Sequence, residues 1–372
     1  MRRIPISILI LALWIPSASR GAQPYTPPII EMTNVPVKGV NLAPIEDSRL
    51  GPVGYGTNAS ADVLREIADL GATWVSITPF GRMDDLDSTD ILPDFEIPLA
   101  ESIRRTRETI RQAKALGLRV ALIPHLFVMS GRWRGEIDPG SERGWKAWFR
   151  SYERFLDPWV RLAAAEKVDL LSVGVEFKSS SEARADRWIR VIDRVRRTFH
   201  GPLTYSANWD EVEGVGFWSA VDVIGVNGFW PLARTPGDRY PVMRDEAGKV
   251  ARSLDDLAAR YAKPVLLTET GCKAAIDAAL APWEWPEHMD SLAYDGLYQA
   301  EFYEAVLDAM VGRPWFLGLF IWKVISDPYD WSQDPEFGFS PRHKPGWKVL
   351  QRWFGLAWSA CEDPVTSRPE CR

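Results

Sequence analysis

The sequence predicts an α/β fold, a single (β/α)8 TIM barrel, and three observations support this. Apolar runs of strand length alternate along the chain with segments of helical spacing. Two of these runs, LLSVGVE at 170–176 and VLLTE at 265–269, are too apolar for a solvated edge strand, which is typical of parallel strands covered by helices on both faces. There are eight runs in all, and eight parallel strands joined by right-handed crossovers close into a barrel. With 372 residues, 46% of them hydrophobic, the chain can form the core of a large barrel.

The predicted strands and helices follow one another in a regular order. The strands are expected at 38–42, 74–78, 119–125, 170–176, 203–208, 222–227, 264–269 and 316–322. Val63, Ile67 and Leu70 share one helical face before the second strand, and Gly71 ends that helix. The same spacing precedes the next three strands, over 103–116, 145–162 and 188–195.

Both ends of the chain are expected to lie outside the barrel, which we place at residues 38–357. Positive charge at 1–3, an apolar stretch over 4–16 and small residues at 17–19 have the pattern of an export signal. The stretch is too short for a spanning helix, so a permanent anchor is the weaker alternative. We therefore expect a signal peptide at 1–22, an N-terminal extension at 23–37 and a secreted or periplasmic protein. A tail at 358–372 contains Cys361 and Cys371, which could pair after export.

Composition and charge restrict the ligands. A net charge of -6 and a pI near 5.5 disfavour nucleic acid, because no basic stripe is available for phosphates. No later segment is apolar enough to cross a bilayer, so no membrane partner is expected after signal cleavage. Four dispersed histidines form no metal motif, and we expect neither metal nor cofactor. The 18 Trp suit sugar rings, although most should lie in the core, and we expect a monomer that binds carbohydrate.

Two other enzyme classes were weighed against this barrel. Gly54, Gly56 and Ala59 fit a relaxed dinucleotide-binding spacing, but no apolar strand runs directly into them. No G-x-S-x-G turn occurs, so a serine hydrolase would lack its characteristic nucleophile turn. Neither class is favoured.

Two of the predicted strands end in a glutamate. The run LLSVGVE ends at Glu176, and VLLTE ends at Glu269. Barrel enzymes place their chemistry at the C-terminal ends of strands. Two carboxyl groups on different strands of one rim are therefore a candidate pair for cleaving a glycosidic bond. A structural ion pair is the alternative for either glutamate taken alone.

Other strand ends on the same rim carry polar or aromatic residues that a purely structural barrel does not require. We predict that a sugar subsite is formed by Asn41, His125, Trp133, Asn208, Trp209, Asn227, Trp230 and Trp322. His125 could instead only bind other groups of the rim. Trp133 and Arg134 lie in the loop 131–135, which could add to this subsite or be an ordinary exposed loop.

An ordered set of motifs over residues 38–354 resembles glycoside hydrolase family 113. The motifs are VGVEF at 173–177, TYSANW at 204–209, DVIG at 222–225, TETG at 268–271, PH at 124–125, GRWRGEI at 131–137 and GLFIWK at 318–323. The resemblance implies a retaining barrel enzyme active on β-1,4-mannan, with Glu176 as acid/base and Glu269 as nucleophile. Val175 departs from the Asn that related families usually carry there. Gly228, Phe229 and Trp230 stand where a Tyr often follows the sixth strand.

The resemblance also implies a double displacement, in which Glu269 attacks the anomeric carbon and a protonated Glu176 donates to the departing oxygen. Retention predicts carboxyl groups about 5 to 5.5 Å apart, whereas inversion needs a wider gap. Two alternatives stay open: a related enzyme for a glucan or galactan, and a non-catalytic carbohydrate-binding barrel. Internal or terminal cleavage depends on whether the segment at Trp283 and Trp285, or the Trp331 region, blocks the groove.

Overall fold

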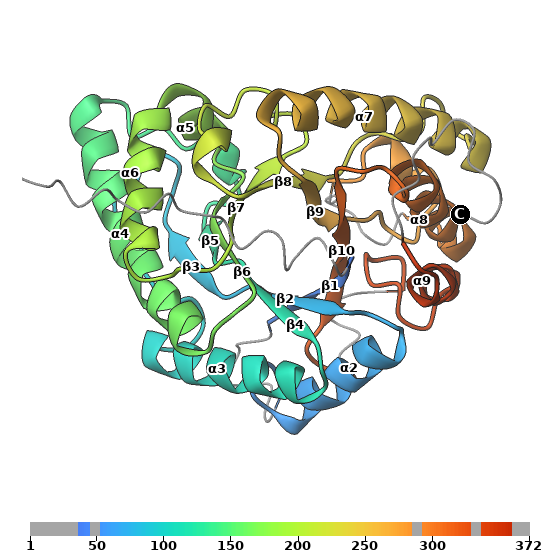
Figure 1. Cartoon of the computed structure of the whole chain (residues 1–372), viewed down its shortest axis with the longest axis horizontal. Coiled ribbons are helices and arrows are strands. Elements are labelled where there is room, and N and C mark those ends of the chain that lie inside the picture. Colours follow the sequence, from blue (N-terminus) through green and yellow to red (C-terminus); the bar gives the residue numbers. More distant parts are fainter. Residues whose placement is uncertain (1–35, 45–52, 285–291, 329–335, 359–372) are drawn as a thin grey trace, which may run out of the picture.

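The barrel predicted from the sequence is present in the computed structural model, which describes residues 36–44, 53–284, 292–328 and 336–358. Eight parallel strands close in the order β1-β10-β9-β8-β7-β6-β4-β2 (Figure 1). Their bounds are Val37–Ala43 (β1), Trp74–Ile77 (β2), Arg119–Leu122 (β4), Leu170–Val175 (β6), Leu203–Asn208 (β7), Val223–Gly228 (β8), Val265–Thr270 (β9) and Phe316–Ile325 (β10). The predicted (β/α)8 fold is therefore confirmed.

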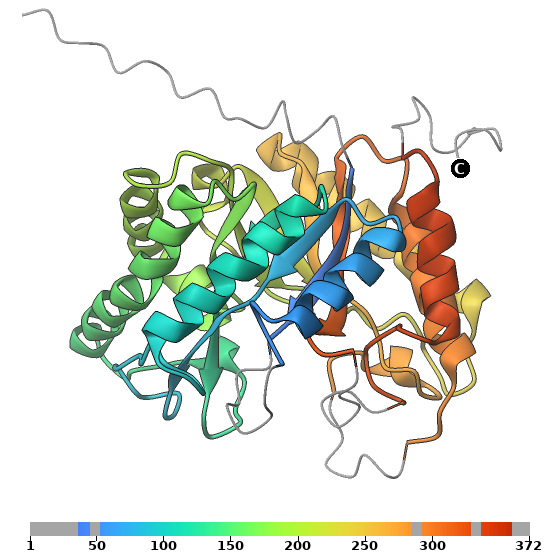
Figure 2. The same cartoon turned by 90° about the horizontal axis from the view of Figure 1, so that it is seen from below.

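Helices surround the strands, and Figure 2 shows α2 and α3 in front of them. The helices are α2 (Asn58–Asp69), α3 (Leu99–Ala115), α4 (Glu142–Ala165), α5 (Lys178–Ala183), α6 (Ala185–Arg196), α7 (Tyr240–Tyr261), α8 (Gly296–Met310) and α9 (Pro345–Gly355). At the N-terminus of several of these helices a side-chain oxygen accepts a hydrogen bond from a backbone amide, because the first amides of a helix lack partners within it. Thr57 accepts from the amide of Ser60, and Asp295 accepts from that of Tyr298. None of the described helices has the length and apolar character of a membrane span.

The hydrophobic core has two parts. A small cluster of strand residues, including Val37, Leu170, Leu266 and Phe320, fills the barrel interior. A larger cluster packs the outer faces of the strands against the helices. Most Trp were expected in the core, and several are fully enclosed there: Trp74, Trp148, Trp159, Trp188 and Trp218.

The predicted third strand, 119–125, is wrong in its extent, because β4 ends at Leu122. Pro124 cannot donate a backbone hydrogen bond and interrupts the ladder, as Pro79 does after β2. Beyond each proline the chain resumes, so that β3 (Phe80–Met83) and β5 (His125–Val128) pair in a separate two-stranded sheet. This sheet lies toward α4 (Figure 1). It carries the chain of β2 and of β4 past the barrel rim, and His125 is the first residue of β5.

Several predictions concern residues outside the described ranges. They are the signal peptide at 1–22, most of the extension at 23–37, nearly all of the tail, the pairing of Cys361 with Cys371, and the positions of Trp285 and Trp331. Cys272, in contrast, is described as buried with a free thiol. Burial raises the pKa of that thiol, which suits a packed side chain better than a nucleophile.

Candidate active site

A cavity of about 590 Å³ opens at the C-terminal ends of the barrel strands. Glu176 directly follows β6, Asn208 ends β7, Phe229 follows β8 and Glu269 lies near the end of β9. The lining consists of Gly131, Trp133, Arg134, Glu176, Asn208, Trp209, Asp210, Phe229, Glu269, Trp283, Trp322 and Phe339. The two glutamates singled out in the sequence therefore face one cavity.

Glu176 is held by three separate groups. Its Oε1 accepts from Asn227 Nδ2 at 2.8 Å, and its Oε2 accepts from Trp133 Nε1 at 3.2 Å. Arg134 Nε lies 3.4 Å from the same Oε2. The backbone of Glu176 has φ +56°, a left-handed conformation that a glutamate rarely adopts and that the surrounding structure must enforce. These contacts fix the carboxyl group in one orientation.

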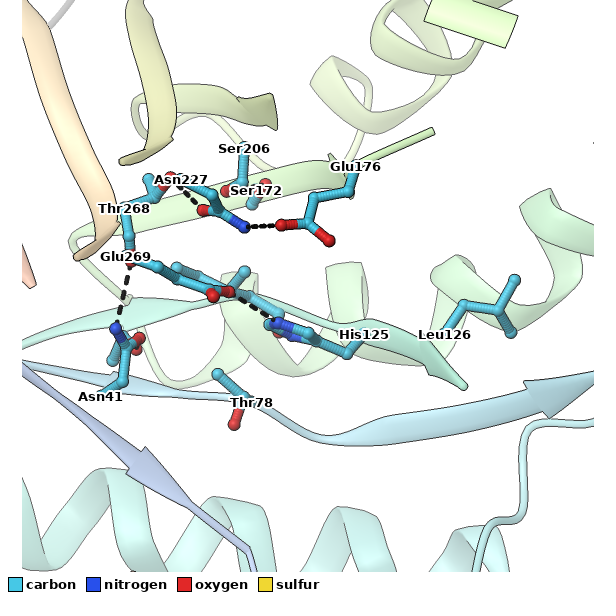
Figure 3. Close-up of polar contacts among 12 residues, drawn as sticks. Asn41, Thr78, His125, Leu126, Ser172, Glu176, Ser206, Asn227, Thr268 and Glu269 are labelled. Carbon is cyan, nitrogen blue, oxygen red and sulfur yellow. Dashed lines mark hydrogen bonds and ion pairs between the residues drawn. The ribbon is translucent and has the colours of Figure 1, made fainter. Parts of the chain in front are cut away.

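Glu269 is also buried, and it contacts His125. Nε2 of His125 lies 3.0 Å from Oε1 of Glu269, across 144 positions of sequence (Figure 3). Burial raises the pKa of Glu269 well above its ordinary value, and the charge of Glu176 raises it further.

The hydrogen bonds of His125 define the tautomer of its ring and the donor in its contact with Glu269. Nδ1 lies 2.8 Å from the carbonyl oxygen of Ile123, which can only accept, so Nδ1 carries a hydrogen. Burial, followed by the charge of Arg134, lowers the pKa of His125 to about 3, so the ring is neutral and Nε2 has no hydrogen. The Nε2 to Oε1 contact then requires a hydrogen from the carboxyl group. Glu269 is therefore the donor in this contact, in agreement with its raised pKa.

Asn227 links the two catalytic candidates. Its Oδ1 accepts from Thr268 Oγ1 at 2.8 Å, which directs its Nδ2 toward Glu176 (Figure 3). The register between β8 and β9 shifts at this point, so that Asn227 pairs with Glu269. Such irregularities re-aim side chains near active sites. The shift places the side-chain amide of Asn227 between the carboxyl groups of Glu176 and Glu269.

Aromatic rings form the walls of the cavity. The rings of Trp209 and Trp283 lie 5.3 Å apart and tilt by 32°. Trp322 stacks against His125 at 6.0 Å, and its peptide bond to Lys323 is cis. Broad aromatic faces beside carboxyl groups are suited to binding sugar rings.

Some of the predicted subsite residues line the cavity, others lie buried behind the lining, and Trp230 lies outside the lining. Trp133, Asn208, Trp209 and Trp322 line the cavity. The second group, Asn41, His125 and Asn227, is buried among protein groups behind the lining.

Their buried positions follow from their partners. Asn41 donates to the carbonyl oxygen of Thr268 at 3.2 Å and accepts from Ser76, so neither end of its amide is left for a sugar. Trp230 is not part of the lining either. Its ring lies against Gly228, where an added Cβ would be only 2.4 Å away, and Phe229 faces the cavity instead.

Arg134, which was expected beside Trp133 in the loop 131–135, also lines the cavity. Other lining residues were not predicted, among them Asp210, which directly follows Trp209. No pattern in the sequence points to Phe339, because it reaches the cavity only through the folded path of the chain. Within the described ranges, no three His, Cys, Asp or Glu side chains gather where they could hold a metal ion.

Comparisons with known proteins agree with this geometry. The sequence model of Glycoside Hydrolase Family 113 matches residues 51–337. A family 113 β-mannanase from Alicyclobacillus acidocaldarius, solved with ManMIm, is 27% identical with a TM-score of 0.74 and covers 86% of this chain and 97% of its own. A family 113 β-1,4-mannanase solved as a complex is 23% identical, with a TM-score of 0.74, 86% of this chain covered and 98% of that chain.

More distant proteins share only the barrel. A β-glucuronidase from Faecalibacterium prausnitzii is 16% identical with a TM-score of 0.57, and the match covers 88% of this chain and 50% of that one. A comparison with curated protein sequences finds no match. The family match extends over most of the barrel, so the resemblance noted in the sequence is confirmed. The chain belongs to glycoside hydrolase family 113 and is a glycoside hydrolase.

Proposed function

We propose that this chain hydrolyses β-1,4-linked mannan with retention of anomeric configuration, using Glu269 as nucleophile and Glu176 as acid/base. One observation carries the proposal: the two carboxyl groups, from β9 and from the end of β6, face one aromatic-walled cavity. Retaining and inverting glycoside hydrolases both use two carboxyl groups placed in this way, and the resemblance to family 113 favours retention. Family membership and the two family 113 mannanases of like fold support mannan as the substrate.

The reaction proceeds in two displacements. Glu269, as a carboxylate, attacks the anomeric carbon while Glu176 protonates the departing oxygen. Glu176 then removes a proton from water, which hydrolyses the glycosyl-enzyme. Trp133 and Asn227 hold the Glu176 carboxyl group during both steps, because each donates to a different oxygen. Both displacements use the same two carboxyl groups, with Glu176 acting as an acid in the first and as a base in the second.

The contact between Glu269 and His125 sets a condition for this cycle. Glu269 must lose the hydrogen that it donates to His125 before it can attack. In the reactive form Glu269 is a carboxylate and Glu176 donates the proton to the departing oxygen.

Hydrolysis assays on β-1,4-mannan, a β-glucan and a β-galactan test the substrate class. NMR observation of the first product tests retention, since the product must keep the β configuration. Glu269→Gln and Glu176→Gln should each abolish turnover of mannan, while Glu101→Gln should not, because Glu101 is on α3 and binds Arg104 and Arg105. Full activity of Glu269→Gln would refute the nucleophile, and an α product would refute retention. Preference for glucan or galactan would support the related-enzyme alternative.

We further propose that the protein is exported before it acts. Support comes from the basic start, the apolar stretch and the small residues over positions 1–19. Edman sequencing of protein recovered from outside the cytoplasm should begin near residue 23. An N-terminus at Met1 in that fraction would contradict cleavage.

A further inference from the structure

A third carboxyl group lies buried behind Glu176. Glu211 is in the turn that follows β7, and its side chain is completely enclosed. Its Oε1 accepts from Tyr205 Oη at 2.7 Å and from Ser181 Oγ at 3.0 Å. Its Oε2 has no hydrogen-bond partner among the described residues. A buried carboxyl group with an unsatisfied oxygen destabilises a fold, so some other requirement must keep it there.

The contacts of Glu211 lead to the backbone beside Glu176. Tyr205 Oη, whose hydrogen goes to Glu211, accepts from the amide of Phe177 at 2.7 Å. Phe177 is the residue directly after Glu176. The chain of hydrogen bonds therefore runs from a carboxyl group after β7, through a tyrosine of β7, to the peptide that follows the acid/base.

That peptide is part of a constrained turn. Glu176 itself has the left-handed φ of +56°, and its amide donates to the carbonyl oxygen of Ser206 at 2.9 Å. On the other side, the carbonyl oxygen of Phe177 accepts from the amides of Ser180 and Ser181 at the start of α5. The Tyr205 contact supplies the acceptor for the Phe177 amide between these two anchors. Without it, a buried amide would be unpaired within a turn that already stores strain.

We propose that Glu211 is a positioning residue for the acid/base: acting through the Tyr205 hydroxyl and the Phe177 amide, it holds the left-handed turn that directs Glu176 into the cavity. The inference rests on the proposed function, because it concerns the group that protonates the leaving oxygen. Protonation of Glu211 fits this role. Burial raises the pKa of Glu211 to about 8, so near neutral pH Oε1 is the carbonyl oxygen that accepts from both donors. A neutral side chain can therefore replace it.

The test compares two substrates that depend differently on the acid. A β-mannoside with a 2,4-dinitrophenolate leaving group needs little protonation, whereas a mannan oligosaccharide needs it fully. Because kcat/KM reports the first displacement, Tyr205→Phe should lower kcat/KM for the oligosaccharide by about tenfold or more and change that for the activated glycoside far less. Glu211→Leu should behave like Tyr205→Phe, whereas Glu211→Gln, which keeps the accepting oxygen, should retain near-normal values for both substrates.

Tyr152→Phe provides a matched control. Tyr152 is also fully buried. Its ring packs against Phe177, a contact that phenylalanine keeps, and its hydroxyl donates to the carbonyl oxygen of Val173 in β6 at 2.9 Å and not to the Glu176 turn. Its loss should lower thermal stability but leave the ratio of the two kcat/KM values unchanged. A crystal structure of Tyr205→Phe gives a readout that does not depend on activity, and it should show Glu176 displaced from Asn227.

The outcomes separate the two proposals. If Tyr205→Phe leaves the ratio of the two kcat/KM values unchanged, like the control variant, and Glu176 keeps its place in the crystal, the positioning role is overturned while the proposed function stands. If the unmodified protein cleaves neither substrate, the proposed function fails, and this inference fails with it. A loss confined to the oligosaccharide, with recovery in Glu211→Gln, supports the positioning role.

Discussion

Replacing Glu211 with Gln should change how the stability of the protein depends on pH. The pKa of Glu211 is about 8 in the folded protein, against 4.5 for a free glutamate, and burial is the main cause. Between these values the unfolded chain ionises Glu211 while the folded protein keeps it protonated. The free energy of unfolding therefore falls with rising pH by about 1.36 kcal/mol per pH unit, and the fall levels off near pH 8.

The contribution of Glu211 is fully present below pH 4.5 and is lost as the pH rises through 8. From pH 5 to pH 8 the loss amounts to about 3 to 4 kcal/mol. Glutamine does not titrate, so Glu211→Gln should gain about that much relative to the unmodified protein over this range. Its amide leaves the same Oε2 position unpaired, so the two proteins should otherwise be alike.

Urea unfolding followed by Trp fluorescence, at intervals from pH 5 to pH 8, measures this difference. Glu101→Gln is the control, because Arg104 and Arg105 lower the pKa of Glu101 to about 2 and its titration lies below the range. That variant should give a curve parallel to the unmodified protein. If the Glu211→Gln curve were also parallel, the carboxyl group would already be ionised in the folded protein, and the reasoning would be refuted.

Three further outcomes concern the cavity. Trp133→Phe keeps a ring but loses the Nε1 hydrogen that reaches Glu176. We therefore expect kcat/KM for mannan oligosaccharides to fall about tenfold or more at unchanged thermal stability. An unchanged kcat/KM would show that this hydrogen bond does not contribute to catalysis. The acid limb of the kcat/KM profile should lie well above pH 4.5, because Glu269 must ionise and burial raises its pKa; a limb at or below 4.5 would contradict this. Trp283→Ala should raise KM for oligosaccharides about fivefold with little change in kcat, because the ring beside Trp209 is an exposed wall; a fall in kcat alone would exclude a binding role.

The barrel could be predicted because its signals are local. A parallel strand buried on both faces is an uninterrupted apolar run, and each of the first four runs here is followed by a segment with helical spacing. Glu176 and Glu269 were predictable for the same reason, since the C-terminal ends of parallel barrel strands meet at one rim. Trp133 belonged to a motif that pointed to the site, although nothing local showed that its ring would bind Glu176.

Other features depend on residues that are distant in the sequence. A prediction from apolar runs carried the third strand through His125, but Pro124 ends the barrel ladder, and pairing with β3 then begins a second sheet. Asn41 and Asn227 look alike at strand ends, yet both bind protein groups, because Thr268 of β9 lies beside each. A strand-end position by itself does not tell whether a side chain reaches the cavity or the layer behind it.

By itself, the sequence determined the eight-stranded barrel and the two glutamates at its rim, because apolar runs and helical spacing are properties of short stretches of chain. Only the tertiary structure decided which groups hold those glutamates. His125 reaches Glu269 across 144 positions, and Glu211 reaches the turn at Glu176 through a tyrosine of the neighbouring strand. The protonation and orientation of a buried carboxyl group depend on such neighbours, because in a site without water they replace the solvent around the charge.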